Sequence, residues 1–165
     1  MRYFEKISLN QFKKDISLDD SLYNSIEIPK RATKYSAGYD FYLNEDIVIK
    51  KGEKVKIPTG LKVRLNEDEF LGIYVRSGLG TKKNIRMCNQ TAIIDHDYYN
   101  NISNEGHIFV FLQNHGEEDV FLKKGSAYVQ GIFQKYYLSD NDFYVCEDRV
   151  GGLGSSDKGD EINGK

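Results

Sequence analysis

Five short clusters of polar residues and glycines interrupt the apolar pattern of this sequence, and each offers chemistry. Arg76, Ser77 and Gly78 place a guanidinium, a hydroxyl and main-chain N–H groups on one turn, a donor set that suits phosphate oxygens. Asp95 offers a carboxylate that can take a proton from water, and Tyr98 follows it by three residues. The five clusters are SAGYD (36–40), RSGLG (76–80), NQTAIIDHDYYNN (89–101), GSAYVQ (125–130) and RVGGLGSS (149–156).

Each cluster also has an ordinary structural interpretation when it is taken alone. An Arg-Ser-Gly sequence after a strand is more often a turn than a phosphate site, and a single aspartate such as Asp95 more often forms a turn. Tyr98 could pack in the core, and Gln130 could face solvent from a strand. Taken singly, the clusters indicate only a β domain with polar loops.

The composition is typical of one globular domain, because 165 residues suffice for a substantial core. The formal net charge of −2 provides no strong field toward nucleic acid or an anionic membrane. Apolar runs are far shorter than the ~18 residues that a membrane helix needs. The first fifteen residues lack the apolar region of a secretory signal, and two cysteines are too few for a disulfide framework. We therefore expect a cytoplasmic protein with reduced thiols that binds neither membrane nor nucleic acid stably.

Period-two patterns and turn signals alternate along most of the chain and predict short strands. The strand candidates lie within residues 46–65, 70–77, 107–114 and 118–137. The apolar run in 107–114 is continuous enough to predict burial on both faces. Helix is predicted only within Leu9–Ser25 and for a single turn after Ser77. Many short strands of this kind are typical of an antiparallel sandwich, barrel or jelly roll.

The order and spacing of the five clusters resemble the five motifs of the homotrimeric dUTPase family, across nearly the whole chain. Residues 28–41 resemble the first motif with its approach segment, and residues 57–80 resemble the long run into the second. In the third cluster Asn89 precedes Asp95 by six residues and Tyr98 follows Asp95 by three, as in that family. The last two clusters are similar to the fourth and fifth motifs.

This resemblance implies an all-β fold, a jelly-roll-like distorted β barrel with very little helix, that forms a homotrimer with active sites at subunit interfaces. It implies hydrolysis of dUTP to dUMP and pyrophosphate, which keeps uracil out of DNA. Water would attack the α-phosphorus, and Mg²⁺ would bind through the phosphates and water. Residues 1–148 would form the barrel, and residues 149–165 would form a flexible glycine-rich lid that carries the fifth motif.

The resemblance also implies roles for individual residues. Asp95 would hold the 3′-hydroxyl and orient the attacking water, while Tyr98 would pack under the deoxyribose and leave no room for a 2′-hydroxyl. Asp40 would reach Mg²⁺ only through water. The other substrate-binding residues would be Arg76, Ser77, Gly78, Gln130 and Arg149 at the phosphates, and Asn89, Ile94, Leu153, Gly154 and Ser155 elsewhere on the nucleotide.

The chain departs from the pattern of that family in three places. Ala92 stands where the third motif usually has glycine, and Asn100 or Asn101 replaces a glycine after the tyrosine. The second change is mild, because asparagine tolerates positive φ better than most residues. Leu153 replaces an aromatic residue that commonly stacks on uracil, which predicts a weaker grip on the base.

Two alternatives remain open at this point. A dCTP deaminase has the same fold but needs a glutamate beside the pyrimidine, and the only glutamate in the third-motif hairpin is Glu105, ten residues past Asp95. A nucleotide-gated regulatory binding protein would use extra segments, for which the residues before Ile28 and the long hairpin tip (100–107) are candidates. We expect both segments to be solvated loops rather than partner sites.

Overall fold

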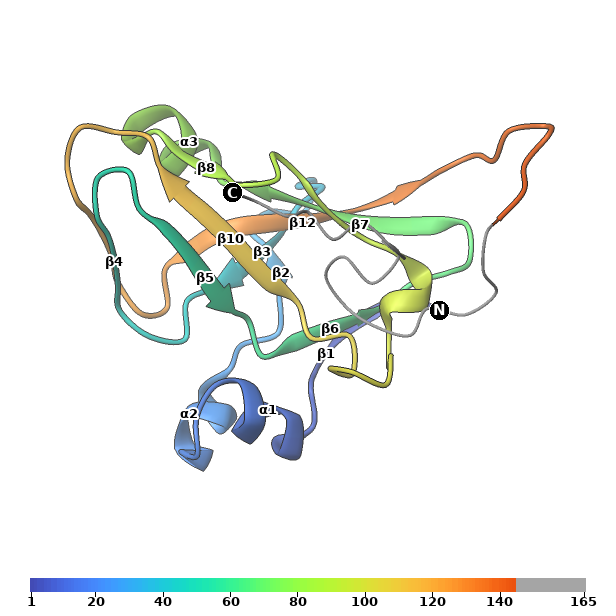
Figure 1. The fold of residues 1–165 in the computed structure, drawn as a ribbon, viewed down its shortest axis with the longest axis horizontal. Helices are drawn as coiled ribbons and strands as arrows, with labels where there is room; N and C mark the ends of the chain where they lie inside the picture. The colour runs from blue at the N-terminus through green and yellow to red at the C-terminus, as the bar shows by residue number, and fades with distance from the viewer. Residues whose placement is uncertain (145–165) are drawn as a thin grey trace, which may run out of the picture.

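The computed structural model describes residues 1–144, which fold mainly into short strands (Figure 1). The strands are β1 (Tyr3–Lys6), β2 (Lys30–Arg31), β3 (Tyr39–Tyr42), β4 (Ile47–Ile49), β5 (Lys54–Pro58), β6 (Leu61–Arg64), β7 (Glu69–Val75), β8 (Ile85–Met87), β9 (Ala92–Ile94), β10 (Phe109–Asn114), β11 (Val120–Leu122) and β12 (Ala127–Lys135). The helices are α1 (Leu9–Asp15), α2 (Asp20–Ser25), α3 (Ser77–Lys83) and the 3₁₀ helix η1 (His96–Tyr98). Within this part of the chain, no helix has the length and apolar character needed to span a membrane. The helix predicted within Leu9–Ser25 is confirmed as α1 and α2, and the single turn predicted after Ser77 is the longer helix α3 of seven residues.

The strands form antiparallel sheets that wrap around one core, and the fold is jelly-roll-like. The largest sheet has the order β2-β3-β12-β7-β9, and a second has the order β5-β10-β8. Two smaller sheets pair β1 with β6 and β4 with β11. Because β3 and β7 flank β12 on its two sides, three segments far apart in the sequence lie next to one another (Figure 1).

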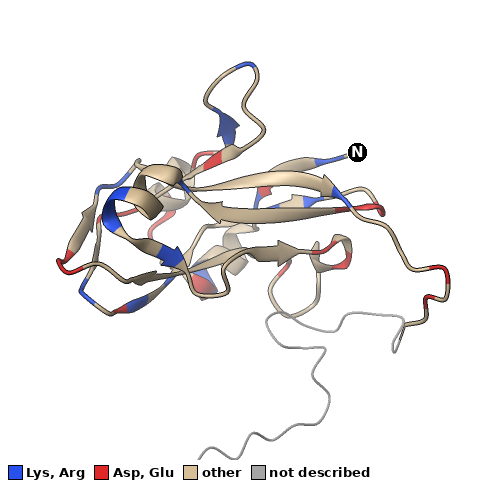
Figure 2. Ribbon diagram, turned by 90° about the horizontal axis from the view of Figure 1, so that it is seen from above, with Lys and Arg blue, Asp and Glu red and all other residues tan. Residues whose placement is uncertain are grey.

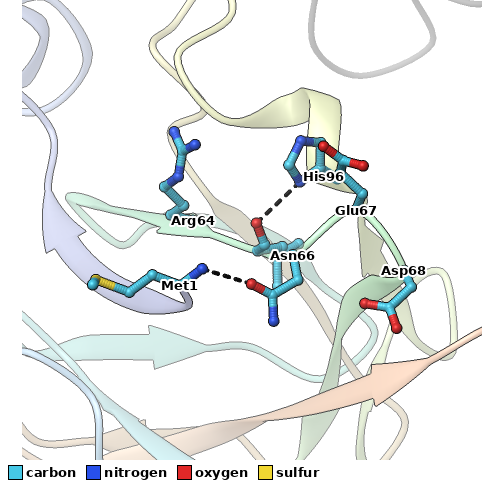
Figure 3. Close-up of a pocket in the computed structure, with 7 residues that line it drawn as sticks. Met1, Arg64, Asn66, Glu67, Asp68 and His96 are labelled. Atoms are coloured by element: carbon cyan, nitrogen blue, oxygen red, sulfur yellow. Dashed lines mark hydrogen bonds between the residues drawn. The ribbon is translucent and has the colours of Figure 1, made fainter.

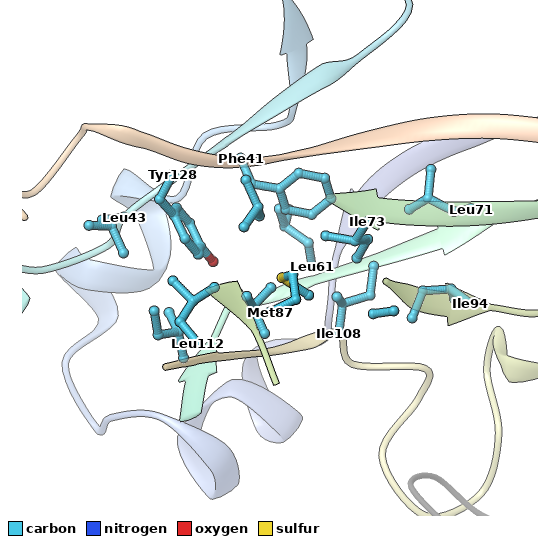
Figure 4. Packing of buried hydrophobic residues seen from close by; sticks show 14 of the residues in the cluster. Phe41, Leu43, Leu61, Leu71, Ile73, Met87, Ile94, Ile108, Leu112 and Tyr128 are labelled. Atoms are coloured by element: carbon cyan, nitrogen blue, oxygen red, sulfur yellow. The ribbon is translucent and has the colours of Figure 1, made fainter. Parts of the chain in front are cut away.

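The core lies where side chains of the five-stranded sheet meet side chains of β6, β8 and β10. Figure 4 shows Phe41, Ile73 and Tyr128 on one side facing Leu61, Met87 and Leu112 on the other. Tyr128 is 1% exposed, and its hydroxyl has no hydrogen-bond partner among the described residues. Burial raises the pKa of this phenol, so Tyr128 acts only as a large core side chain.

The prediction that residues 107–114 are buried on both faces is wrong for the strand itself. In β10 burial alternates: Val110 and Leu112 point into the core, while Phe109 and Phe111 are half-buried on the outer face. An antiparallel strand with the core on one side buries only every second side chain. The ammonium group of Lys56 lies 4.0 Å from the ring centroid of Phe109 and covers part of that outer face.

The prediction that the residues before Ile28 form a solvated loop is also wrong. β1 pairs with β6, and the side chains of Ile7 and Phe12 are fully buried. Tyr23 packs edge-on against Phe12, and its hydroxyl donates to the carbonyl of Ile7 at 2.9 Å. A fully buried phenylalanine contributes about 2–3 kcal/mol relative to an exposed one, so this segment is an integral part of the fold.

Candidate active site

Three of the five clusters meet on neighbouring strands of the five-stranded sheet. Asp40 on β3 lies opposite Gln130 on β12, and Gln130 lies opposite Tyr74 on β7, two residues before Arg76. The Nε of Arg76 lies 3.3 Å from Oδ1 of Asp40, and its main-chain N–H donates to the carbonyl of Tyr128. The Asp40 side chain is 9% exposed and that of Arg76 is 43% exposed. The guanidinium is therefore anchored by one carboxylate and still accessible to a ligand.

Gly38 lies directly against the side chain of Gln130. A Cβ at position 38 would lie 2.2 Å from Oε1 of Gln130, so a larger residue there would displace the amide end of that side chain. The glycine of the first cluster thus leaves room for the amide of the fourth cluster where it now lies. The sequence alone indicated only a tight turn of the backbone at Gly38.

The second cluster turns directly into α3. Arg76 is the N-cap of this helix, and its carbonyl accepts from the N–H groups of Leu79 and Gly80 at 3.0 Å. Ser77 and Gly78 form the exposed first turn, and a Cβ at Gly78 would meet nothing within 4 Å. Figure 2 shows positive charge on α3, while both signs are mixed over the rest of the fold. The guanidinium, the hydroxyl and open space for a ligand therefore lie together.

Asp95 stands elsewhere, at the end of β9. It is exposed, it precedes η1, and its carbonyl accepts from the N–H of Tyr98 at 3.2 Å. With Glu67, His96 and Tyr136 it lines a cavity of about 390 Å³. Asp95 thus lines a space that can hold a small ligand.

A second cavity of about 420 Å³ adjoins this one through His96 and Glu67 (Figure 3). The Nδ1 of His96 lies 3.0 Å from the carbonyl of Leu65, which fixes the ring between the two cavities. The ammonium group of Met1 donates to Oδ1 of Asn66 at 2.7 Å and lies on the wall of the second cavity.

The structure does not bring Asp95 and Arg76 together within one chain. Ile94 pairs with Leu71 near the start of β7, so Asp95 lies beyond that end, whereas Arg76 follows the last residue of β7. At about 3.3 Å per residue, the backbones of Asp95 and Arg76 are roughly 20 Å apart. The candidate residues of each chain therefore form two separate groups.

Tyr98 is buried, with 7% of its surface exposed. Its hydroxyl donates a hydrogen bond to the carbonyl of His107 at 2.9 Å and accepts one from Nδ2 of Asn104 at 2.9 Å. The hydroxyl is thus held by the protein, and the ring is the part of this residue that can contact a sugar.

The turn between β8 and β9 carries the other residues that the sequence assigned to the third cluster. Asn89 is exposed at its tip, and Gln90 adopts a positive φ of 60°. Ile94 is 9% exposed, and Ala92, which replaces the usual glycine, is 7% exposed and pairs with Ile73. The alanine side chain is accommodated in the sheet without disrupting the pairing.

The segment 100–107 is a loop whose tip is exposed at Ile102 and Ser103, as predicted, whereas Asn101, Gly106 and His107 are buried against the rest of the fold. Asn100 has φ 56°, which is the conformation its usual glycine counterpart suits, and this bears out asparagine as a mild replacement. Asn101 organises the turn: its Oδ1 accepts from the N–H groups of Ser103 and Asn104, and its Nδ2 donates to the carbonyl of Tyr98. Sequence analysis missed these residues, although their asparagine-rich and serine-rich composition is typical of self-bonded turns.

Glu105 points away from the candidate site and toward α1. Its carboxylate accepts from the N–H of Ser8 at 2.9 Å and from the Ser8 hydroxyl at 2.6 Å. Burial alone would raise the pKa of Glu105, but the hydrogen bonds from Ser8 and the charge of Lys62 lower it. A carboxylate held in this way is not placed as the base of a deaminase.

Arg149, Leu153, Gly154, Ser155 and the glycine-rich lid lie outside the described residues, so their roles stay predictions. Within residues 1–144, no group of three or more His, Cys, Asp or Glu side chains is arranged to hold a metal ion.

Comparison with known proteins matches the model of the dUTPase family to residues 24–156. The chain belongs to the dUTPase family. Among curated dUTPase-family proteins, the deoxyuridine 5′-triphosphate nucleotidohydrolase of Lactococcus lactis is 43% identical over 132 residues, which cover 79% of this chain and 88% of that one. The enzyme of the same name from Rickettsia canadensis is 37% identical over 156 residues, covering 91% and 99%.

Solved dUTPase structures have the same fold. The crystal structure of dUTPase from Streptococcus mutans superposes with a TM-score of 0.67 at 37% identity, covering 84% of this chain and 99% of that one. A mutant dUTPase from phage phi11 of S. aureus, at 17% identity, gives a TM-score of 0.65 and covers 87% and 96%. The all-β, jelly-roll-like fold expected from the dUTPase resemblance is thereby confirmed.

Proposed function

We propose that this chain hydrolyses dUTP to dUMP and pyrophosphate at sites shared between the subunits of a homotrimer, which limits uracil in DNA and supplies dUMP. The observation that carries the proposal is that, on one dUTPase-family chain, Arg76 with Asp40 and Gln130 forms one group of candidate residues and Asp95 lies in a separate group. We assign phosphate binding to the half around Arg76 and activation of water to the half around Asp95. Relatives that match most of this chain are dUTP nucleotidohydrolases by name, which supports the same substrate here.

The half around Arg76 binds the triphosphate. Arg76 supplies a fixed cation, because Asp40 and the Tyr128 carbonyl hold it in place while its guanidinium stays accessible. Ser77 and Gly78 add a hydroxyl and main-chain donors, and Gln130 adds an amide beside Asp40. Donors fixed before the substrate arrives also stabilise the charge that develops on the pyrophosphate leaving group.

The half around Asp95 binds the sugar and activates water. The Asp95 carboxylate accepts a hydrogen bond from the 3′-hydroxyl and takes a proton from the water that attacks the α-phosphorus. The ring of Tyr98 lies under the deoxyribose and excludes a 2′-hydroxyl by its bulk. Asn89 and Ile94 flank the uracil, which is recognised through main-chain groups of the turn between β8 and β9.

The separation of the halves supports the homotrimer. A bound dUTP cannot span roughly 20 Å along β7 and still place its α-phosphorus beside Asp95. An Arg76 half from one subunit that faces an Asp95 half from another completes the site. A closed threefold ring makes three equal sites of this kind.

The residues fit a Mg²⁺ ion that is bound through substrate. Asp40 is already paired with Arg76, so its carboxylate suits a water-mediated contact with the ion better than a direct bond. Mg²⁺ bound to the triphosphate would neutralise charge on the leaving group.

The location that we propose is the cytoplasm. Cys88 is an exposed free thiol, as suits a reducing compartment. This inference is independent of the reaction and is tested by fractionating cells that express the chain.

The experiment that tests the function is pyrophosphate release from dUTP, dCTP, dTTP and UTP, with and without Mg²⁺. We expect fast release from dUTP alone, and only with Mg²⁺. Ammonia release from dCTP would instead identify a deaminase. If none of the four nucleotides is turned over, the result would favour a binding protein without enzymatic activity.

A further inference from the structure

The N-terminal segment contacts the loop that holds Tyr98, although residues 1–23 precede the part of the chain that matches the dUTPase model. Ser8, the N-cap of α1, binds the carboxylate of Glu105 with both its N–H and its hydroxyl. The Nζ of Lys14 lies 3.5 Å from the carbonyl of Ser103. Gly106, at φ 82°, lets the loop pass so close beneath Tyr98 that a Cβ there would lie 2.6 Å from the Tyr98 carbonyl.

Asp15 makes the most specific of these contacts. It is the last residue of α1, where a negative charge opposes the helix dipole, so the helix itself gains nothing from a carboxylate there. Its Oδ2 lies 2.6 Å from Nδ1 of His107 and also accepts from Nε2 of Gln11 at 2.8 Å. The carboxylate of Asp15 thus contacts the ring of His107 and is held in place by Gln11 of the same helix.

His107 is held at both ring nitrogens. The ring is fully buried, and its Nε2 accepts a hydrogen bond from the N–H of Gly60 at 2.9 Å. The proton of the ring is therefore on Nδ1, which donates a hydrogen bond to Asp15. The ring also packs 4.1 Å, centroid to centroid, from Phe109 on β10. These contacts leave one tautomer and one ring orientation, and they fix the backbone of residue 107 as well.

The carbonyl of His107 is the acceptor for the hydroxyl of Tyr98. Asn104 closes the arrangement, since its Nδ2 reaches both that hydroxyl and the same carbonyl, at 2.9 and 3.5 Å. A continuous chain of contacts therefore runs from Asp15 through His107 to Tyr98.

We propose that Asp15 and His107 are positioning residues for sugar discrimination, so that the N-terminal segment sets the place of the Tyr98 ring. This inference rests on the proposed function, in which that ring excludes a 2′-hydroxyl. Asp15 touches no substrate atom; it acts through His107 and the carbonyl that holds the Tyr98 hydroxyl. A ring that is free to shift by an ångström admits the larger ribose.

The test compares Asp15→Ala with Asp15→Asn, whose Oδ1 can still accept from Nδ1 of His107, and with Asp20→Ala as a matched exposed carboxylate on α2. Binding of the non-hydrolysable α,β-imido analogues of dUTP and UTP is measured by calorimetry, and KM and kcat are measured for dUTP and UTP. Melting temperature is recorded for every variant. We expect Asp15→Ala to lower the preference for the deoxyribose analogue severalfold and to raise KM for dUTP more than it lowers kcat. Asp15→Asn restores most of the preference, and Asp20→Ala leaves it unchanged.

An unchanged preference in Asp15→Ala overturns the inference, whatever its melting temperature. If Asp15→Ala does not fold, Asn104→Leu, which removes the side chain that closes the contact at Tyr98, is expected to lower the preference, and an unchanged preference there overturns the inference as well. Failure of the proposed function has a different signature, since the wild type would then release no pyrophosphate from dUTP. In that case the binding measurement still decides the inference, because the preference for the dUTP analogue over the UTP analogue can be compared between the wild type and Asp15→Ala. A wild type that shows no such preference overturns the inference.

Discussion

Two aspartates of the candidate site differ in their surroundings, and this difference separates their roles. Asp40 is almost buried and faces the guanidinium of Arg76, so its charge is used to hold a cation in place. Asp95 is exposed and lines a cavity, where substrate and water can reach it. A carboxylate that takes a proton from water must be within hydrogen-bond reach of that water.

Replacement of Asp95 by asparagine tests its role as proton acceptor. Asp95→Asn keeps the shape and one hydrogen-bond acceptor but removes the basic carboxylate, so we expect kcat for dUTP to fall about a hundredfold or more. The dissociation constant of the α,β-imido analogue of dUTP should change little. Steady-state kinetics and calorimetry measure the two quantities, with Asp20→Asn as a remote control. A kcat near that of the wild type contradicts the role.

Replacement of Tyr98 by alanine tests the filter against ribonucleotides. Tyr98→Ala opens space under the sugar, so the ratio of kcat/KM for dUTP to that for UTP should fall by about tenfold or more. The ratio is its own control, because a loss of folded protein lowers both rates equally. An unchanged ratio would mean that another residue excludes the 2′-hydroxyl.

At the scale of elements, the junction of α1 with the loop 100–107 contains a buried histidine that should make stability depend on pH. Burial lowers the pKa of His107 below its ordinary value of 6.5, although Asp15 partly offsets this effect. Between pH 6.5 and the lower pKa of the folded state, the unfolded chain therefore binds more of a proton at His107 than the folded chain does. The free energy of unfolding should fall as the pH drops from 6.5 toward 5.5, by up to about 1.4 kcal/mol per pH unit.

Urea unfolding of the full chain between pH 7.5 and 5.5 measures this dependence. His107→Gln should flatten it, whereas His115→Gln, an exposed position, should leave it unchanged. If the glutamine variant at 107 does not fold, the wild-type curve still decides: equal stability at pH 7.5 and 5.5 would show that His107 does not stay neutral in the folded protein.

The same junction shows where prediction from the sequence stopped. Alternating patterns and turn residues located most strands, and α1 and α2 fell within the stretch expected to be helical. The contacts of Asp15 with His107 and of Ser8 with Glu105 join residues more than 90 positions apart, and nothing in either local pattern identifies the partner. The sequence therefore indicated helix in the first segment without its packing partner, and the second segment was interpreted only as a solvated loop.

In the candidate site, too, one part could be predicted from the sequence and another could not. The cluster of Asp40, Arg76 and Gln130 could be expected from the motif order alone, and the strand register brings these three residues together. The distance from Arg76 to Asp95 could not be predicted, because it depends on which end of β7 pairs with β9. The order of the motifs indicates which residues act together. The fold decides whether those residues can meet within one subunit.

For the whole molecule, the proposed division of each site between two subunits leads to a prediction about mixtures of inactive variants. Arg76→Ala damages only the phosphate half, and Asp95→Asn damages only the water-activating half. If each site takes one half from each of two subunits, some sites in mixed trimers combine the intact Asp95 of the first variant with the intact Arg76 of the second. Random assembly of equal amounts restores about a quarter of the sites.

The experiment unfolds the two purified variants together, refolds them and measures pyrophosphate release from dUTP. Each variant refolded alone stays inactive, and the mixture should recover about a quarter of the activity of the refolded wild type. Mixing without unfolding controls for subunit exchange, and a mixture with the double variant Arg76→Ala/Asp95→Asn should recover nothing. A site contained within one chain cannot be rescued in this way, because every chain in the mixture carries a damaged half. An inactive mixture of well-folded trimers would therefore contradict the shared site, and recovered activity requires that Arg76 and Asp95 act from different subunits.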